Sequence, residues 1–261
     1  PAIECESIAY ADDIVILIAG NARIELQEKG QDVVTRVSKW YTGQKLSLSA
    51  EKTEMLLVKG KLDAERPPTI KINGKCIKMR QIIKYLGVYL ERPKNQSARV
   101  RNNSQVQKLF NSLAIVAKTK WGLGHAAMST LYKGLYELIT TYAAAGWSDL
   151  LNGNTKKIQT RFQRTALLQV TKSYRTTSTE ALPVIRGVMP IDLLIEVKAR
   201  LHKKKRGHDE PSSEKEVIQE AIQKWQERWL STQKGRTTFE YFSSVKERLE
   251  NRWVIPDHYM R

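Results

Sequence analysis

Two adjacent carboxylates stand between two apolar runs near the start of this chain, and they constrain its fold more than any other feature. The apolar runs are residues 3–10 and 14–19, with Ala11-Asp12-Asp13 between them. This pattern predicts a β-hairpin whose second run is a buried strand. Like charges held together are costly to bury unless a cation neutralises them. The pair is thus either an ordinary polar turn or two oxygen ligands for a divalent metal ion.

Residues 1–93 carry mixed α and β patterns. Apolar side chains at helical spacing predict a helix over 23–42 that Gly43 ends. Strand patterns cover 53–58, 70–72, 76–79 and 82–90, and Asn73-Gly74 is a strong hairpin signal.

From residue 94 onward the pattern is helical. Four helices are expected, each with one apolar face, and a linker is expected over 208–213, before the last of them. The faces comprise Val106, Leu109, Phe110, Leu113 and Val116; Leu131, Leu135, Leu138, Ile139 and Tyr142; Ile158, Phe162, Thr165, Leu168 and Gln169; and Val217, Ile218, Ile222, Trp225 and Trp229. A further helix is expected after Pro190, through Leu193, Leu194, Val197 and Leu201.

Composition narrows the class of protein. Hydrophobic residues make up 41% of the chain, which argues against a wholly disordered protein. No apolar run approaches the roughly 20 residues that cross a bilayer. Two cysteines, Cys5 and Cys76, cannot build a disulfide framework or a zinc site by themselves, so a reducing compartment is expected.

The positive charge is concentrated in one segment. The net charge is +17, and residues 94–206 contain 20 basic and 5 acidic residues, a net of +15. Such a balance indicates a polyanionic partner, either a nucleic acid or an acidic membrane surface. The concentration in one segment favours a surface that follows phosphates over an ordinary mixed-charge surface.

Several motifs, in order along the chain, resemble a known family. Tyr10-Ala11-Asp12-Asp13 resembles the catalytic palm motif of reverse transcriptases. Residues 46–58 resemble the next palm segment in enzymes of non-LTR retrotransposons, and 84–88 are similar to the primer-grip hairpin. The similarity continues through 174–178, 181–182, 187–190, 225–229 and 235–237. The whole chain resembles the Pol-like proteins of elements that insert into arthropod ribosomal DNA.

The resemblance implies an α+β fold and an activity. Residues 1–93 would form the C-terminal half of a palm with an antiparallel sheet and a helix, and 94–150 a helical thumb. Residues 151–206 would form a basic connector, and 207–261 a linker and C-terminal helices. The implied activity is RNA-directed DNA synthesis, in which a nicked target-DNA 3′-hydroxyl is extended with dNTPs on element RNA by two-metal, Mg²⁺-dependent phosphoryl transfer.

The resemblance also assigns residue roles. Asp12 and Asp13 would be catalytic carboxylates and Mg²⁺ ligands, and Lys52 would lie near the triphosphate, although an exposed strand-edge lysine is the alternative. The primer end would contact Tyr10, Ala11, Lys84, Tyr85, Leu86 and Gly87. A core strand with a bulge glycine is the alternative for 85–87.

Family members need a third carboxylate upstream of Tyr10, yet the chain starts at Pro1, already in a strand-like run. We therefore expect a piece of a longer polyprotein, preceded by an endonuclease and inactive alone.

A thumb would grip the template–primer duplex through its phosphates. The candidate cations are Arg99, Arg101, Lys108, Lys118, Lys120, Lys156, Lys157, Arg161, Arg164 and Arg175. The aromatic residues Trp121, Tyr132, Tyr136, Tyr142 and Trp147 are expected in the core. Lys203-Lys204-Lys205-Arg206 is either a nuclear-localisation patch or a basic helix end. The resemblance implies a nuclear protein with a cytoplasmic ribonucleoprotein stage, which would need such a patch.

Two other functions are compatible with parts of this pattern. A degenerate or co-opted remnant would keep only nucleic-acid binding, and the upstream frame would distinguish it from the enzyme. A group II intron maturase shares the palm, but residues 174–190 argue against that class. The expected partners are element RNA, target DNA, dNTPs and the N-terminal part of the same polyprotein, with no membrane.

Overall fold

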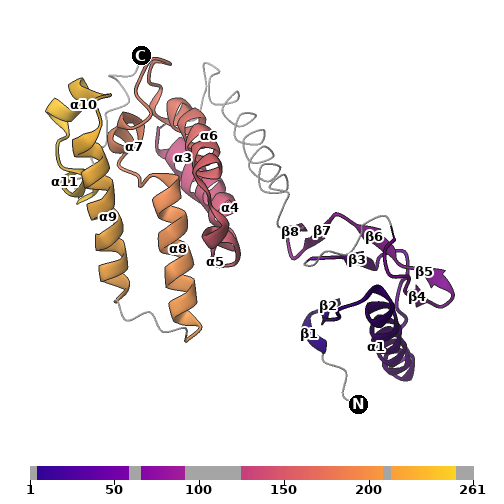
Figure 1. The fold of residues 1–261 in the computed structure, drawn as a ribbon. Coiled ribbons are helices and arrows are strands. Elements are labelled where there is room, and N and C mark those ends of the chain that lie inside the picture. The colour runs from indigo at the N-terminus through magenta and orange to yellow at the C-terminus, as the bar shows by residue number, and fades with distance from the viewer. Residues whose placement is uncertain (1–4, 59–65, 92–124, 208–212, 251–261) are drawn as a thin grey trace, which may run out of the picture. The chain divides into compact units, whose positions relative to one another are not determined.

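The computed structural model describes residues 5–58, 66–91, 125–207 and 213–250 (Figure 1). The chain divides into two compact units, Pro1–Ala98 and Arg99–Arg261. The first contains short strands and one long helix, and the second is helical in its described part. The expected mixture of α and β structure is confirmed, whereas the division into palm, thumb and connector stays a prediction.

The two apolar runs near the start form the expected hairpin. β1 (Cys5–Tyr10) pairs antiparallel with β2 (Asp13–Ile18), and the pair at the turn is Tyr10 with Asp13. The expectation that the second run is buried is wrong in this structure, since Ile14 is 37% and Leu17 45% exposed. Within the described residues this sheet has only two strands, so no further strand covers its apolar side chains.

Helix α1 (Arg23–Gly43) follows, and its side chains bind the backbone of an extended segment. Arg23 donates to the carbonyl of Pro67, Gln27 accepts from the amide of Thr69, and Gln31 both donates to and accepts from the backbone of Lys71. Every fourth helix residue thus meets every second extended residue. The two spacings match because four helical residues rise about 6 Å and two extended residues about 6.6 Å.

The remaining strands of this unit form three more two-stranded ladders. The strands are β3 (Glu54–Leu56), β4 (Lys71–Ile72), β5 (Lys75–Cys76), β6 (Lys78–Arg80), β7 (Ile82–Tyr85) and β8 (Val88–Glu91). β3 pairs parallel with β6, and the other two ladders are antiparallel hairpins. Asn73 and Gly74 form the predicted turn with φ values of 47° and 78°. The strand pattern over 82–90 forms a hairpin, as the resemblance of 84–88 to a hairpin implied, because Leu86 and Gly87 turn the chain.

The second unit is built from helices of very different lengths (Figure 1). They are α3 (His125–Leu131), the π-helix η1 (Tyr132–Glu137), α4 (Leu138–Thr141), α5 (Ala144–Trp147), the 3₁₀ turn η2 (Ser148–Leu150), α6 (Gly153–Thr171), α7 (Ala181–Arg186), α8 (Ile191–Lys205), α9 (Glu214–Ser231), α10 (Arg236–Tyr241) and α11 (Val245–Glu250). The expected helices after Pro190 and over 217–229 are confirmed as α8 and α9. The expected helix through Val106–Val116 lies outside the described residues.

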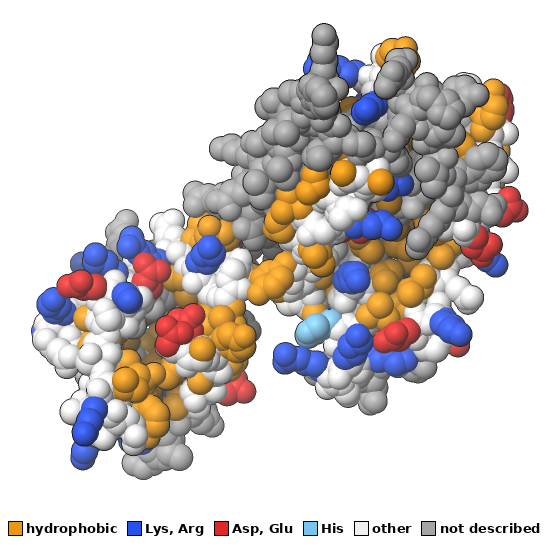
Figure 2. Space-filling view, turned by 180° about the vertical axis from the view of Figure 1, so that it is seen from behind, with side chains coloured by type: hydrophobic (Ala, Val, Ile, Leu, Met, Phe, Trp, Pro, Cys, Tyr) orange, Lys and Arg blue, Asp and Glu red, His pale blue; other side chains and the backbone are white. Residues whose placement is uncertain are grey.

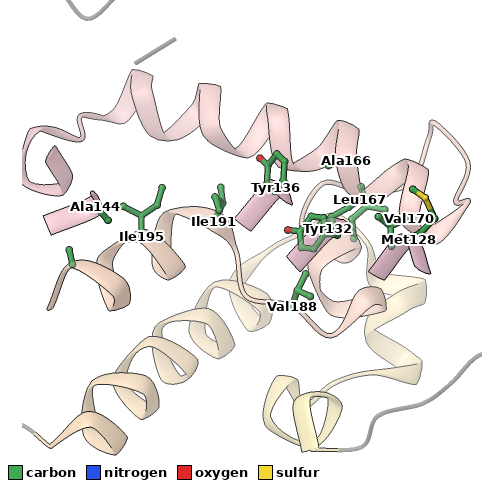
Figure 3. Close-up of a cluster of buried hydrophobic side chains, with 12 residues drawn as sticks. Met128, Tyr132, Tyr136, Ala144, Ala166, Leu167, Val170, Val188, Ile191 and Ile195 are labelled. Carbon is green, nitrogen blue, oxygen red and sulfur yellow. The ribbon is translucent and has the colours of Figure 1, made fainter. Parts of the chain in front are cut away.

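The main core lies between α3, η1, α6 and α8. Figure 3 shows Tyr132 and Tyr136 pointing into it, with Leu167 of α6 and Ile191 of α8 close by. The two tyrosine rings stack with centroids 5.2 Å apart. These two tyrosines are therefore core residues, as the sequence predicted.

In two helical segments, the apolar face predicted from the sequence is rotated relative to the face that is buried in the structure. In 125–142 the buried residues are Met128, Tyr132, Tyr136 and Thr140, whereas Leu138, Ile139 and Tyr142 are exposed. In α6 the buried residues are Thr155, Gln159, Gln163, Ala166, Leu167 and Val170. Of the face expected there, Phe162 and Leu168 are half-buried against the same core.

A second core forms around the two tryptophans of α9. Trp225 and Trp229 are buried together with Val184 and Leu193, as their i, i+4 spacing predicted. A capping box starts this helix: Ser213 Oγ accepts from the amide of Glu216, and the Glu216 carboxylate accepts from the amide of Ser213.

Two exclusions made from composition can be compared with the structure. No helix in the described ranges has the length and hydrophobicity needed to cross a membrane. Cys5 and Cys76 are both exposed and free. Neither cysteine therefore forms a disulfide within this chain.

Candidate catalytic and nucleic-acid-binding residues

The two adjacent carboxylates occupy the tip of the β1–β2 hairpin. Because Tyr10 pairs with Asp13, only Ala11 and Asp12 form the loop. Ala11 has a φ of 53°, a left-handed conformation that is uncommon for a residue with a Cβ. A positive φ at the first loop position is a feature of the tight turns that join twisted strands. The turn thus holds Asp12 and Asp13 as consecutive residues at an exposed tip.

The carboxylate oxygens of this pair are suitable ligands for a hard divalent cation. Both carboxylates are exposed, and carboxylate oxygens are the ligands that Mg²⁺ prefers. No group of three or more Asp, Glu, His or Cys side chains that could hold a metal ion occurs in the described ranges. Asp12 and Asp13 can therefore supply part of a metal site, and the other ligands would come from outside those ranges.

The side chain of Tyr10 lies beside the pair and is 65% exposed. It ends β1 and is the last residue before the turn. Its ring is thus available for contact with another molecule.

Lys52 lies in the turn that precedes β3. Its amide donates to the hydroxyl of Ser49 at 3.3 Å, and its side chain is exposed. No hydrogen bond or ion pair joins it to Asp12 or Asp13 in the part of the chain that the structure describes. Both interpretations of Lys52, triphosphate contact and surface lysine, therefore stay open.

The β7–β8 hairpin holds the predicted primer-binding residues. Tyr85 pairs with Val88, so Leu86 and Gly87 form the loop, with φ values of 45° and 81°. Leu86 is 38% exposed despite its apolar side chain. Lys84 Nζ lies 5.9 Å from the ring centre of Tyr89. The result is a tight turn with an apolar tip, since two-residue loops with both φ values positive match the twist of the strands.

The structure describes five of the ten candidate cations. Arg99, Arg101, Lys108, Lys118 and Lys120 lie outside the described residues. Arg161 is exposed on α6, as are Lys156 and Lys157 on the same helix.

Arg164 makes three hydrogen bonds within the protein. Its Nη1 donates to the carbonyl of Thr177 at 2.6 Å and to Thr179 Oγ1 at 3.0 Å. Its Nη2 donates to the carbonyl of Arg175 at 2.6 Å. The guanidinium thus fixes the loop that follows α6, and only its remaining N–H groups could reach a phosphate.

Gln163 is a buried polar residue that the apolar spacing did not reveal. Its Nε2 donates to the hydroxyl of Tyr132 and to the carbonyl of Met189, each at 3.0 Å, and its Oε1 accepts from the amide of Ile191 at 2.9 Å. It therefore ties α6 to η1 and to the start of α8. The sequence feature that could have pointed to Gln163 is the polar pair Gln163-Arg164 within an otherwise amphipathic helix.

Basic side chains also gather at the end of α8. His202, Lys203, Lys204 and Lys205 occupy its last turn, where the helix dipole favours positive charge. Lys203 pairs with Asp149 at 2.8 Å. Figure 2 shows a group of Lys and Arg side chains at the lower end of the larger unit, where α8 ends in Figure 1. Both interpretations of 203–206 stay open.

Known proteins similar to this chain define its class. A retrovirus-related Pol polyprotein from the type-1 retrotransposable element R1 4 of Nasonia vitripennis is 30% identical over 96% of this chain and 72% of its own length. The Pol polyprotein from element R1 of Bradysia coprophila is 32% identical over 95% of this chain and 26% of its own length. A putative 115 kDa protein in element R1DM of Drosophila melanogaster is 30% identical over 92% of this chain and 25% of its own length.

The class is that of retrotransposon Pol polyproteins. Within it, this chain belongs to the R1 family of type-1, non-LTR elements of the LINE type. It spans about a quarter of the length of two of these relatives. No protein-family model and no solved structure matches the chain.

Proposed function

We propose that this chain contributes the catalytic carboxylate hairpin and the primer-binding hairpin of an RNA-directed DNA polymerase. One observation carries the proposal: a two-residue turn holds Asp12 and Asp13 side by side at the tip of an apolar hairpin, in a chain of the R1 family. The substrates would be a nicked target-DNA 3′-hydroxyl and dNTPs, with element RNA as the template.

Asp12 and Asp13 would hold Mg²⁺ through their carboxylate oxygens. The bound ions would activate the attacking hydroxyl and neutralise the charge that develops on the leaving phosphates. Tyr10 would support the primer end with its exposed ring. Lys52 would place positive charge near the departing pyrophosphate.

The β7–β8 turn would support the primer strand from another side. Gly87 has no Cβ, so a nucleic-acid backbone can approach it closely. Leu86 is held in a left-handed conformation by the two-residue turn. Strained turns of this kind persist where the surrounding structure determines them, and they are common at binding sites.

The exposed apolar residues of the first hairpin support a larger sheet. Ile8 is 53% and Leu17 45% exposed on a two-stranded ladder. A hairpin alone is marginally stable in water, whereas three or more strands with an apolar face are stable. We expect the complete protein to extend this sheet and to bring a third carboxylate beside Asp12.

The test is primer extension by the complete polyprotein carrying Asp12→Asn. Synthesis should be abolished, because the amide keeps the shape of the side chain but loses its charge, while RNA binding changes by less than a few-fold. Asp32→Asn is the matched control, since Asp32 is a helix carboxylate paired only with Arg36 in the described chain. Normal synthesis by the Asp12→Asn protein would overturn the metal assignment.

A second candidate function is nucleic-acid binding without catalysis. The net charge of +15 over residues 94–206 favours binding and does not depend on the carboxylates. An upstream frame that lacks the third aspartate would favour this function, whereas an intact frame would favour the polymerase. Either function fits a nuclear protein with a cytoplasmic ribonucleoprotein stage, for which 203–206 would be the import signal.

A further inference from the structure

One aromatic side chain of the second unit is almost fully exposed although the loop that carries it is fixed. Tyr174 is 86% exposed and lies three residues after the end of α6. No ring or cation in the described ranges stacks on it. A single exposed aromatic residue is ordinary on a protein surface and by itself indicates no function. What distinguishes Tyr174 is its loop, which is held from two directions.

The loop closes on itself and is also bound to α6. The amide of Thr177 donates to the carbonyl of Tyr174 at 3.0 Å, which makes 174–177 a hydrogen-bonded turn. Arg164 then binds the carbonyls of Arg175 and Thr177 from the side of α6. A planar guanidinium that binds several acceptors at once fixes their relative positions. The backbone that carries Tyr174 is therefore anchored in the fold before any partner arrives.

The charges around the ring select the class of partner. Between α6 and α7, Lys172 and Arg175 are the cations and Glu180 is the carboxylate, and all three are exposed. The two cations lie within two residues of Tyr174, whereas Glu180 lies six residues beyond it. The charge next to Tyr174 in the chain is therefore positive and attracts polyanions. An exposed aromatic ring between phosphate-binding cations is the arrangement that proteins use to stack nucleobases of single strands.

We propose that Tyr174 is a stacking platform for an unpaired base of a nucleic-acid strand, that Lys172 and Arg175 contact the flanking phosphates, and that Arg164 is a positioning residue. This inference rests on the proposed nucleic-acid function but adds a base-binding site in the second unit, separate from the carboxylate hairpin. It also explains why Arg164 is bonded internally although it belongs to the most basic part of the chain.

The test measures binding of the full chain to two labelled strands of equal length and equal phosphate number. One is oligouridine, and the other is an abasic strand that has no bases. Tyr174→Ala should weaken oligouridine binding by about 5- to 150-fold, the range expected for one lost stacking contact. Tyr174→Phe keeps the ring and should stay within two-fold. Neither change should alter binding of the abasic strand.

The outcomes separate this inference from the proposed function. Salt-sensitive binding of both strands that Tyr174→Ala leaves unchanged, or weakens equally, would overturn the stacking site alone. Failure to bind either strand at low salt would overturn nucleic-acid binding by this unit altogether. Loss confined to the base-bearing strand would establish the site.

The role of Arg164 is tested by a double-mutant cycle. Arg164→Lys keeps the charge but cannot reach the same three acceptors, so it should weaken oligouridine binding and spare the abasic strand. Adding Arg164→Lys to Tyr174→Ala should cause no further loss, because the contact through which Arg164 acts is already absent. Additive losses, or equal losses on the two strands, would show that Arg164 acts through its charge and not through the loop.

Discussion

Gln163 and Tyr132, 31 positions apart, are joined by a hydrogen bond of 3.0 Å inside the main core of the second unit. The same amide also binds the backbone of Met189 and Ile191. Burial raises the pKa of the Tyr132 hydroxyl well above its ordinary value, so that it stays protonated. One side chain therefore satisfies three polar groups from two other chain segments at the main core.

Gln163→Leu should lower the free energy of unfolding by about 2–4 kcal/mol, since it leaves the buried amide of Ile191 and the partly buried carbonyl of Met189 without this partner. Tyr132→Phe removes only the hydroxyl and should cost about 1 kcal/mol. Urea unfolding followed by circular dichroism measures both values. Gln219→Leu, at an exposed position of α9, is the control and should change stability by less than about 0.5 kcal/mol. Equal effects at the two glutamines would contradict the assigned role of Gln163.

Alanine substitutions at Gly235 and Gly207 distinguish two costs of adding a Cβ, the cost in backbone conformation and the cost in packing. Both have a left-handed backbone, with φ values of 80° and 76°. A Cβ at Gly235 would lie 3.1 Å from Ala181 Cβ and 3.3 Å from Trp229, whereas one at Gly207 would meet nothing within 4 Å among the residues that the structure describes. Gly207→Ala should cost about 1–2 kcal/mol for the conformation alone. Gly235→Ala should cost at least about 1 kcal/mol more, because its surroundings are already packed. Similar melting temperatures for the two variants would refute the packing argument.

Local signals predicted the fold where local interactions determine it. The β1–β2 hairpin follows from two apolar runs and a polar turn, and Asn73-Gly74 turns as its φ preferences require. The helical spacing of Trp225 and Trp229 correctly predicted that both side chains are buried in the same core. At the candidate site, the sequence alone indicated the adjacent carboxylates at a turn, since their order in the chain fixes their proximity.

Interactions between distant segments were not predictable in the same way. The π-helix Tyr132–Glu137 has a wider turn than an α-helix, so a step of four residues keeps Met128, Tyr132, Tyr136 and Thr140 on one face. Periodicity of an ordinary helix instead predicted Leu138 and Ile139 in the core. The partners of Arg164 are mainly backbone carbonyls 11 and 13 positions further along the chain, which no side-chain pattern reveals.

Glu137 should make the stability of the second unit depend on pH. Desolvation raises the pKa of its carboxyl above 4.5, although Lys133, Lys198 and Arg186 act in the opposite direction. The folded state therefore binds the proton more tightly than the unfolded state, and stability falls as pH rises from 4.5 through the raised pKa. Glu137→Gln should stabilise the protein at neutral pH, and the difference should shrink as pH falls toward 4.5. Urea unfolding across this range measures it, and a pH-independent difference would contradict the desolvation argument.

The basic segment should bind nucleic acid with an affinity that falls steeply with salt. If six to ten phosphates are contacted, affinity should fall by about 10³–10⁵ between 50 and 200 mM salt. Changing Lys156 and Lys157 together to Gln should reduce the slope of log affinity against log salt by about two, one for each lost phosphate contact. The matched control is Lys215→Gln with Lys246→Gln, which removes the same charge from residues 207–261, a segment of net charge −1. Equal slope changes in both double variants would show that binding follows overall charge, and salt-independent binding would exclude phosphate contacts by residues 94–206.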